Sequence, residues 1–322
     1  MSGFDHESVL RAEVIEHLAP RDNGVYVDGT LGGGGHSRAI LQAAPDAILI
    51  GIDRDPSALD AARAELAEFG ERARFVHGQY SEIATILAEL KIGQVAGILL
   101  DLGVSSPQLD RAERGFSFSK SGPLDMRMDP TCGETVLELI RGSDDVDLGE
   151  LIKELGEERH GKKIAKLIKE AADADLLHTT LDLAAVIAKG IPIIEQRKSK
   201  IHPATRTFQA LRIAVNAELV ELEKLLHGFP DLLAPGGRCA IIAFHSLEDR
   251  LVKNRFRDLT WTTSLPRHLA EQAGERLEPV VELVTRKAVF AAEAEVERNP
   301  RARSARLRVC ERTTAANVPA TR

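Results

Sequence analysis

The segment 25–39, Val-Tyr-Val-Asp-Gly-Thr-Leu-Gly-Gly-Gly-Gly-His-Ser-Arg-Ala, decides the fold that we expect. Its apolar start predicts a short buried strand over 25–27, and Asp28 places a carboxylate at the end of that strand. The four successive glycines predict a loop whose backbone adopts positive φ angles and lets a ligand approach closely. A helix is expected from His36 or Ser37. Its first N–H groups have no partner inside the helix, so they favour a polar or anionic ligand group.

A second apolar segment, residues 47–52, ends in Asp53, which lies 20 residues after Gly33. A carboxylate at about that distance from a glycine-rich loop suits hydrogen bonding to ribose hydroxyls. Together the two features favour a nucleoside site over a tight turn with a solvated aspartate. Asp28 argues against a dinucleotide, because its charge would lie close to a pyrophosphate. A ligand with an amino group or a sulfonium, such as S-adenosylmethionine, would instead be attracted by that charge.

Length and composition narrow the class of protein further. The 322 residues suffice for one large or two ordinary domains, and 43% are hydrophobic. The net charge of −7 gives no overall attraction to nucleic acid, so any RNA site must be a local basic patch. Three cysteines without metal-ligand spacing indicate a reducing compartment and no metal site. We read no signal peptide and no apolar run near the ~18 residues of a membrane span, so a cytoplasmic protein is expected.

Polar or aromatic residues follow each further strand of the pattern. A third strand is expected over 74–77 with Tyr80 just beyond it, and a fourth over 95–100 with Asp101 at its end. Alternating strands and helices with apolar strands predict an α/β fold with a doubly wound, mostly parallel sheet. Ligands bind outside the carboxyl ends of such strands. We therefore expect one site to contain Asp28, Asp53, Tyr80 and Asp101. The ring of Tyr80 could lie against an adenine, and a half-buried core tyrosine is the alternative.

Residues 101–110, Asp-Leu-Gly-Val-Ser-Ser-Pro-Gln-Leu-Asp, form the most distinctive stretch of the chain. Together with the glycine loop they resemble the bacterial 16S ribosomal RNA (cytosine-N4)-methyltransferase family. The resemblance covers nearly the whole chain and includes further blocks at 113–118, 122–129, 156–159, 202–206, 244–249 and 299–301. It implies a Rossmann-like class I methyltransferase fold with S-adenosyl-L-methionine as cofactor. The implied reaction is methylation of the exocyclic N4 amine of a cytidine in the decoding region of 16S ribosomal RNA, either naked or in the small ribosomal subunit.

The resemblance also implies which residues bind the donor, namely Gly34, Gly35, His36, Asp53, Tyr80, Asp101 and Gln108. We add Asp28 to these donor-binding residues because its negative charge would attract the amino group or the sulfonium of S-adenosylmethionine. Family members often carry phenylalanine where this chain has Tyr80, so the aromatic face is kept. The pair His160-Gly161 departs from the aromatic or different small pair expected after the block 156–159, which puts only a local helix contact in doubt.

At the end of the fourth strand and in the loop after it, Asp101, Ser106 and Pro107 are expected to act on the methyl acceptor. The loop with Ser106 and Pro107 resembles the Ser-Pro-Pro loop of other amino-methyltransferases, with Gln108 in place of the second proline. We expect the carbonyl groups of Ser106 and Pro107 to position the amine, with Asp101 as a candidate proton acceptor. His245, after the fifth strand, could be an acid–base or positioning group, and a structural histidine is the alternative.

From about residue 109 the pattern changes to long helical periodicities, at 136–140, 148–155, 162–171 and 181–188. We therefore expect a helical insertion domain at 111–212 that recognises RNA. It would interrupt a methyltransferase domain made of 1–110 and 213–322. After the insertion, a Pro-Gly-Gly turn precedes a fifth strand within 232–243, and two antiparallel strands, at 280–287 and 305–309, close the sheet.

Basic residues gather at two places that could contact phosphates. The segment 196–206, just before a helix expected to run to about 226, carries Arg197, Lys198, Lys200 and Arg206. A solvated lead-in to that helix is the alternative explanation. Arg301 and Arg303 lie in a loop near the end of the chain.

Three rival functions are kept open. An NAD-dependent dehydrogenase would bind reduced nicotinamide and no S-adenosylmethionine. A non-catalytic RNA-binding protein on the same fold would bind RNA without turnover. A DNA-directed amino-methyltransferase would prefer DNA as acceptor. The sequence also leaves a homodimer open.

Overall fold

The computed structural model describes residues 8–260, 269, 272 and 279–315. The chain divides into two compact units, Met1–Gly103 with Val220–Arg322, and Val104–Leu219. We call the first the sheet unit and the second the helical unit. The helical unit starts earlier and ends later than the predicted insertion at 111–212. Within the described residues, no helix is both long and apolar enough to cross a membrane.

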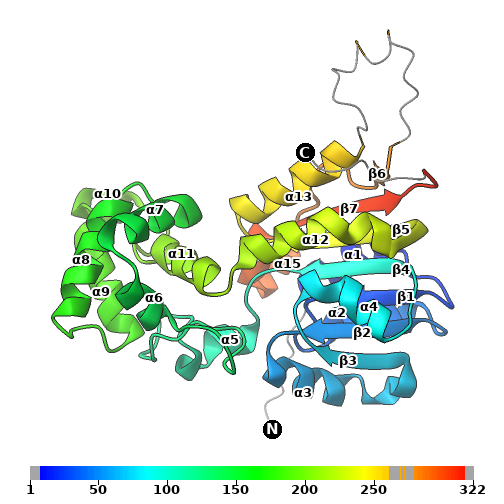
Figure 1. The fold of residues 1–322 in the computed structure, drawn as a ribbon, viewed down its shortest axis with the longest axis horizontal. Coiled ribbons are helices and arrows are strands. Elements are labelled where there is room, and N and C mark those ends of the chain that lie inside the picture. The colour runs from blue at the N-terminus through cyan, green and yellow to red at the C-terminus, as the bar shows by residue number, and fades with distance from the viewer. Residues whose placement is uncertain (1–7, 261–268, 270–271, 273–278, 316–322) are drawn as a thin grey trace. The chain divides into compact units, whose positions relative to one another are not determined.

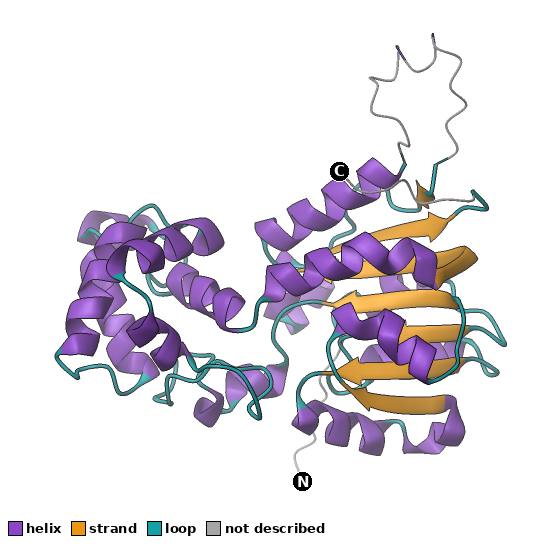
Figure 2. Cartoon of the chain, in the orientation of Figure 1, coloured by secondary structure: helices purple, strands orange, loops and turns teal. Residues whose placement is uncertain are grey.

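The sheet unit is built on one seven-stranded sheet in the order β3-β2-β1-β4-β5-β7-β6 (Figures 1 and 2). The pairs formed by β1 to β5 are parallel, and β7 is antiparallel to both β5 and β6. This confirms the predicted doubly wound, mostly parallel sheet. The order reverses between β1 and β4, and ligands of such sheets bind at that point, outside the carboxyl ends. The strands are β1 Val25–Asp28, β2 Ile48–Asp53, β3 Ala73–His77, β4 Val95–Asp101, β5 Leu233–Ala243, β6 Val281–Leu283 and β7 Arg306–Arg312.

Helices cover both faces of this sheet, and each face has its own apolar core. Ile98 and Leu100 of β4 pack into one core and Leu99 into the other, because side chains alternate along a strand. The first face carries α4 Ile83–Glu89, α12 Glu218–Leu232 and α13 Ser246–Leu259; the second carries α1 Arg11–Leu18, α2 Gly35–Ala43 and α3 Pro56–Glu65. The shorter elements of the unit are η1 Ala67–Arg72, η2 Tyr80–Glu82, α15 Glu293–Arg298 and η4 Pro300–Ser304.

The prediction of one long helix up to about residue 226 is wrong. The structure has two helices there, α11 (Thr205–Val215) and α12 (Glu218–Leu232). Ala217 adopts a positive φ of 49°, which a helix cannot accommodate. The Asn216 side chain donates to the carbonyl of Met126 and accepts from the N–H of Met128 at 2.8 and 2.7 Å, respectively. These bonds reach a loop far away in the sequence, so helical periodicity does not reveal the break.

The helical unit has a separate core, formed by residues such as Met126, Ile140, Ile152, Ile164 and Leu211. The four predicted helical periods correspond to α6, α7, α8 and α9. Its helices are α5 Ser106–Asp110, η3 Ala112–Arg114, α6 Val136–Gly142, α7 Asp145–Gly156, α8 Gly161–Asp173, α9 Thr180–Gly190, α10 Ile193–Lys198 and α11 Thr205–Val215. A β-carbon on Gly161 would lie 2.6 Å from the carbonyl oxygen of Gly149, so glycine permits the close packing of α7 on α8.

Candidate functional site

Asp28, at the end of β1, is a buried carboxylate with 1% of its surface exposed. One oxygen accepts from the hydroxyl of Ser37 at 2.7 Å, and the other accepts from the N–H of Thr30 at 3.2 Å. Burial raises the pKa of Asp28, although the Ser37 hydroxyl and the neighbouring His36 act in the opposite direction. The carboxylate therefore ties the start of α2 to the end of β1 and holds the glycine loop between them.

The glycine loop ends directly in α2, whose first residue is Gly35 rather than His36 or Ser37. Gly34 has a φ of 85°, in the left-handed region, and its N–H donates to the carbonyl of Leu31 at 2.8 Å. A β-carbon on Gly35 would collide with the side chain of Ser8. The N-cap residue of α2 is Gly34, which has no side chain to cap the first turn. Its leading N–H groups therefore remain available to a ligand at the carboxyl edge of the sheet.

Asp53, at the end of β2, faces the same loop. Its two oxygens accept from the N–H groups of Gly32 and Asp55, each at 2.8 Å. Burial raises the pKa of Asp53 to about 6. A carboxylate offers about four acceptor positions, and these two bonds use two of them. The remaining positions suit hydroxyl donors such as those of a ribose.

His36 and Asp101 form the polar centre of the site. The Nε2 atom of His36 lies 3.6 Å from an oxygen of Asp101, and the histidine is only 6% exposed. Burial lowers the pKa of His36, but Asp101 and Asp28 outweigh that effect and raise it. Within the described part of the chain, Nδ1 of His36 and Oδ1 of Asp101 are buried without a hydrogen-bond partner. Buried polar atoms of this kind are rare in native proteins, so a ligand that supplies partners fits here.

Two further contacts bring the strand ends together. The N–H of Asp101 donates to the Thr30 hydroxyl at 2.6 Å, which links the ends of β4 and β1. Tyr80, half-buried at the start of η2, lies against Gly29, where a β-carbon would come within 2.8 Å of its Cβ. The structure thus places Asp28, Gly34, Gly35, His36, Asp53, Tyr80 and Asp101 at one edge of the sheet. That these residues bind a donor stays a prediction.

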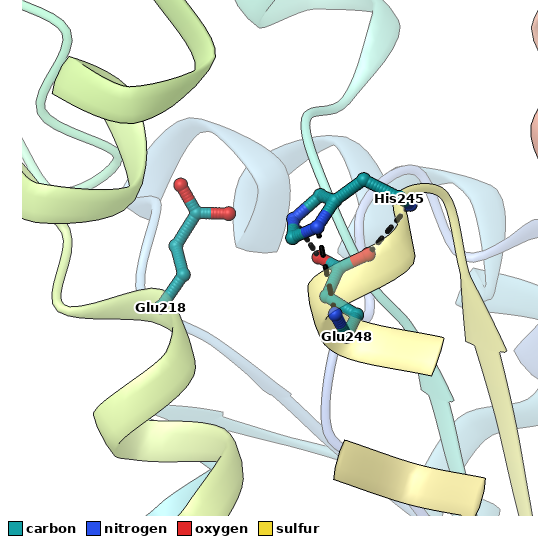
Figure 3. A group of neighbouring side chains, drawn as sticks. All are labelled: Glu218, His245 and Glu248. Atoms are coloured by element: carbon teal, nitrogen blue, oxygen red, sulfur yellow. Dashed lines mark hydrogen bonds and ion pairs between the residues drawn. The ribbon is translucent and has the colours of Figure 1, made fainter. Parts of the chain in front are cut away.

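His245 is the N-cap of α13, and Glu248 completes a capping box with it (Figure 3). Glu248, 2% exposed, accepts from the N–H groups of Phe244 and His245 at 2.8 and 3.2 Å, respectively. The ring faces the same residue: Nδ1 accepts from the N–H of Glu248 at 3.5 Å, and Nε2 lies 3.1 Å from its carboxylate. These contacts favour the structural alternative for His245. Glu218, also drawn in Figure 3, belongs to the helical unit, where it pairs with Arg212.

Ser106, Pro107 and Gln108 belong to the helical unit, where they open the short helix α5. Gln108 is buried, and its side-chain carbonyl accepts from the N–H of Ser105 at 3.0 Å. The hydroxyl of Ser105 accepts in return from the N–H of Gln108 at 3.4 Å. This capping box fixes the loop that carries Ser106 and Pro107. The roles expected of these three residues stay predictions.

The basic residues fall into two groups. Arg197 and Lys198 form the last turn of α10, Lys200 follows, and Arg206 lies in the first turn of α11, all in the helical unit. Arg301 and Arg303 lie in η4 of the sheet unit, the first half-buried and the second exposed.

Sequence reasoning missed three residues that organise the site, namely Thr30, Ser37 and Glu248. The first two were part of the quoted loop, but their partners depend on the fold. Glu248 had a detectable signal, because it stands three residues after an N-cap, as in a capping box.

Comparison with known proteins adds independent findings. The family model described as "MraW methylase family" matches residues 3–313. "Ribosomal RNA small subunit methyltransferase H" of Citrifermentans bemidjiense is 51% identical over 97% of this chain and 100% of its own length. The proteins of the same name from Geobacter sulfurreducens and Anaeromyxobacter sp. (strain K) are 50% and 51% identical over 96% of this chain and 99% and 98% of their own lengths. Among solved structures, an rRNA methylase from Streptococcus thermophilus gives a TM-score of 0.38 at 10% identity, over 94% of this chain and 95% of that one.

Proposed function

Because the chain belongs to the MraW methylase family, we propose that it transfers a methyl group from S-adenosyl-L-methionine to small-subunit ribosomal RNA. The observation that carries this proposal is the 51% identity to a ribosomal RNA small subunit methyltransferase H along that relative's entire length. The structure supports it through polar groups at the carboxyl edge of the sheet, such as Nδ1 of His36 and Oδ1 of Asp101, which are buried and could bind a ligand. Such an enzyme works where ribosomes are made, in the cytoplasm.

The acceptor that we propose is the N4 amine of a cytidine in the decoding region of 16S RNA, on the strength of residues 101–110. The lone pair of this amine is delocalised into the ring, which makes it a weak nucleophile. The protein must therefore hold it in line with the methyl carbon, at about 3–3.5 Å. An amine inside a duplex is out of reach, so the base has to be unpaired or flipped out.

The donor supplies a methyl group bonded to a cationic sulfur. Asp53 would accept from its ribose hydroxyls through the two acceptor positions that its loop bonds leave over. Tyr80 would cover the adenine. The uncapped N–H groups at Gly35 and His36 suit the carboxylate of its amino-acid end. The negative charge of Asp28 and Asp101 favours the amino group and the sulfonium.

The acceptor side depends on Asp101 and on the loop after it. The unpartnered Oδ1 of Asp101 would accept a hydrogen bond from the amine and then its proton after transfer. The carbonyl groups of Ser106 and Pro107 would hold the second hydrogen, which directs the lone pair at the methyl carbon. His245 would then contribute by capping α13 beside β5.

Methyl transfer from radiolabelled donor tests the proposal. The full chain is incubated with small ribosomal subunits, naked 16S RNA or a DNA oligonucleotide. We expect label in RNA and none in DNA, and a loss of at least about 100-fold in rate for Asp101→Asn. Asp46→Asn, the same change at an exposed aspartate before β2, serves as the control. Label in DNA alone would favour the DNA-directed rival. Donor and RNA binding without any transfer would favour the non-catalytic one.

A further inference from the structure

The helical unit holds a pocket of about 450 Å³ between the start of α8, helix α10 and the start of α11. Pockets of about 300–1,000 Å³ are typical of sites for small ligands. Apolar side chains such as Ile201 and Pro203 line it. Its charged lining consists of three cations, Arg159, Lys198 and Arg206, and two carboxylates, Glu158 and Glu195. Aliphatic surface beside several cations suits a ligand with a flat apolar part and an anionic part.

The pocket also presents a fixed aromatic face. His202 stacks on Phe118 with ring centroids 4.6 Å apart and planes 30° apart, and it is exposed although Phe118 covers one side of its ring. Phe118 in turn packs edge-on against Phe208 at 4.8 Å. Nδ1 of His202 accepts from the N–H of Ala204 at 3.1 Å, so one edge of the ring and one face of it are held in place. The outer face can therefore receive a base without any ordering of the side chain.

The cations of the pocket differ in how far they are already neutralised. Arg159 and His160 both pair with Glu195. Arg206 pairs with the carboxylate of the buried Glu158 at 3.9 Å and donates to the carbonyl of Glu157 at 3.3 Å. Among the described residues, the side chain of Lys198 has no ion-pair or hydrogen-bond partner. Lys198 is therefore the cation most available to an incoming anion, in a chain whose net charge is −7.

We propose that this pocket binds one unpaired nucleotide of RNA, with its base stacked on His202 and its phosphate at Lys198 and Arg206. The proposal rests on the proposed function only in taking ribosomal RNA as the source of that nucleotide. The nucleotide is not the methylated cytidine, because the acceptor site proposed above is built on Asp101 of the sheet unit and this pocket belongs to the helical unit. Stacking on a ring tolerates every base, so the pocket positions RNA without reading its sequence.

Equilibrium dialysis with radiolabelled uridine 5′-monophosphate tests this. Uracil has no exocyclic amine and therefore cannot be methylated at N4, and the His202 variants below assign its binding to this pocket. The full chain should bind this nucleotide more tightly than uridine or inorganic phosphate. His202→Asn keeps an acceptor for the Ala204 N–H but removes the ring, and should weaken binding about tenfold. His202→Phe keeps a stacking ring and should bind nearly as the unchanged chain does.

Two further variants sharpen the result. Lys198→Ala should weaken binding of the nucleotide but leave binding of uridine unchanged. His227→Asn makes the same substitution at an exposed histidine of the sheet unit. It should change neither nucleotide binding nor uridine binding, and it serves as the control for replacing a histidine by asparagine. Thermal melting of each variant shows that it folds. Equal binding by His202→Asn and the unchanged chain would overturn the proposal, and so would phosphate binding as tightly as the nucleotide or an absence of nucleotide binding.

The outcome is separable from that of the proposed function. If nucleotide binding behaves as described but no methyl reaches RNA, the proposed function fails and the pocket stands. If RNA is methylated and His202→Asn changes neither nucleotide binding nor the KM for RNA, the pocket fails and the function stands. The proposal expects His202→Asn to raise the KM for RNA about tenfold without altering donor affinity.

Discussion

The replacement of Asp53 by asparagine probes the donor site most sharply. The change keeps the size of the side chain and removes its charge. In the structure, Asp53 accepts from Gly32 and Asp55 and retains two acceptor positions toward the site. An asparagine has one acceptor oxygen, and its NH2 group can only donate. That NH2 group would therefore face either a backbone N–H group or a ribose hydroxyl of S-adenosylmethionine, and one hydrogen bond would be lost.

The expected loss of affinity for S-adenosylmethionine follows from the one hydrogen bond of Asp53 that the substitution removes. A hydrogen bond to a charged group contributes about 1.5–3 kcal/mol. Each 1.4 kcal/mol is a factor of about ten in affinity, so Asp53→Asn should bind S-adenosylmethionine about 10- to 150-fold more weakly. Loss of a loop bond also lowers stability, so the melting temperature is recorded alongside.

The pH dependence gives a second, independent readout. Burial raises the pKa of Asp53 to about 6, and ribose hydroxyls favour its ionised form. Below that pH the carboxyl is protonated, so donor affinity should fall as pH falls, by about tenfold between pH 7 and pH 5. His36 and Asp28 also have raised pKa values and titrate in both proteins, so the difference between the two profiles isolates Asp53.

Isothermal titration calorimetry with S-adenosylmethionine at pH 5, 6, 7 and 8 measures both effects. Asp46→Asn, the same change at an exposed residue before β2, should match the unchanged chain at every pH. If Asp53→Asn binds S-adenosylmethionine as tightly as the unchanged chain at pH 7, Asp53 does not contact the ribose. If the variant keeps the full pH dependence, Asp53 is not the group that titrates.

Three other substitutions should act through stability. Ser37→Ala leaves one oxygen of the buried Asp28 without its donor and should lower the free energy of unfolding in urea by about 1–3 kcal/mol. Glu248→Gln removes the charge that two backbone N–H groups share at the start of α13 and should lower it by about 1–3 kcal/mol; an unchanged urea midpoint would speak against that capping role. Gly161→Ala places a methyl group 2.6 Å from the Gly149 carbonyl, so α7 and α8 should separate at a cost of about 1–3 kcal/mol. Hydrogen exchange should then be faster in the helical unit and unchanged in the sheet.

Local patterns were enough to predict the sheet and the residues at its edge. The apolar run that becomes β4 and the polar Asp101 at its end can be recognised without knowledge of any other segment. The spacing of Asp53 from the glycine loop likewise pointed to its place beside that loop, where the Gly32 N–H now binds it.

What sequence reasoning could not supply depends on contacts between distant segments. Asn216 ends α11 by binding a loop some ninety residues earlier in the chain, a contact that no local periodicity encodes. The free atoms of His36 and Asp101 are evident only when burial and partners are known. His245 left two explanations open in the sequence, and the capping box that it forms with Glu248 favours the structural one.

The identity of the methylated nucleoside decides whether the chain acts on the N4 amine of cytidine. Small-subunit RNA lacking the modification is incubated with the full chain and donor carrying a deuterated methyl group, digested to nucleosides and analysed by chromatography with mass spectrometry. We expect the labelled methyl group in N4-methylcytidine. Label in another nucleoside, such as 5-methylcytidine, or no label in RNA from a chain that binds the donor, would contradict it.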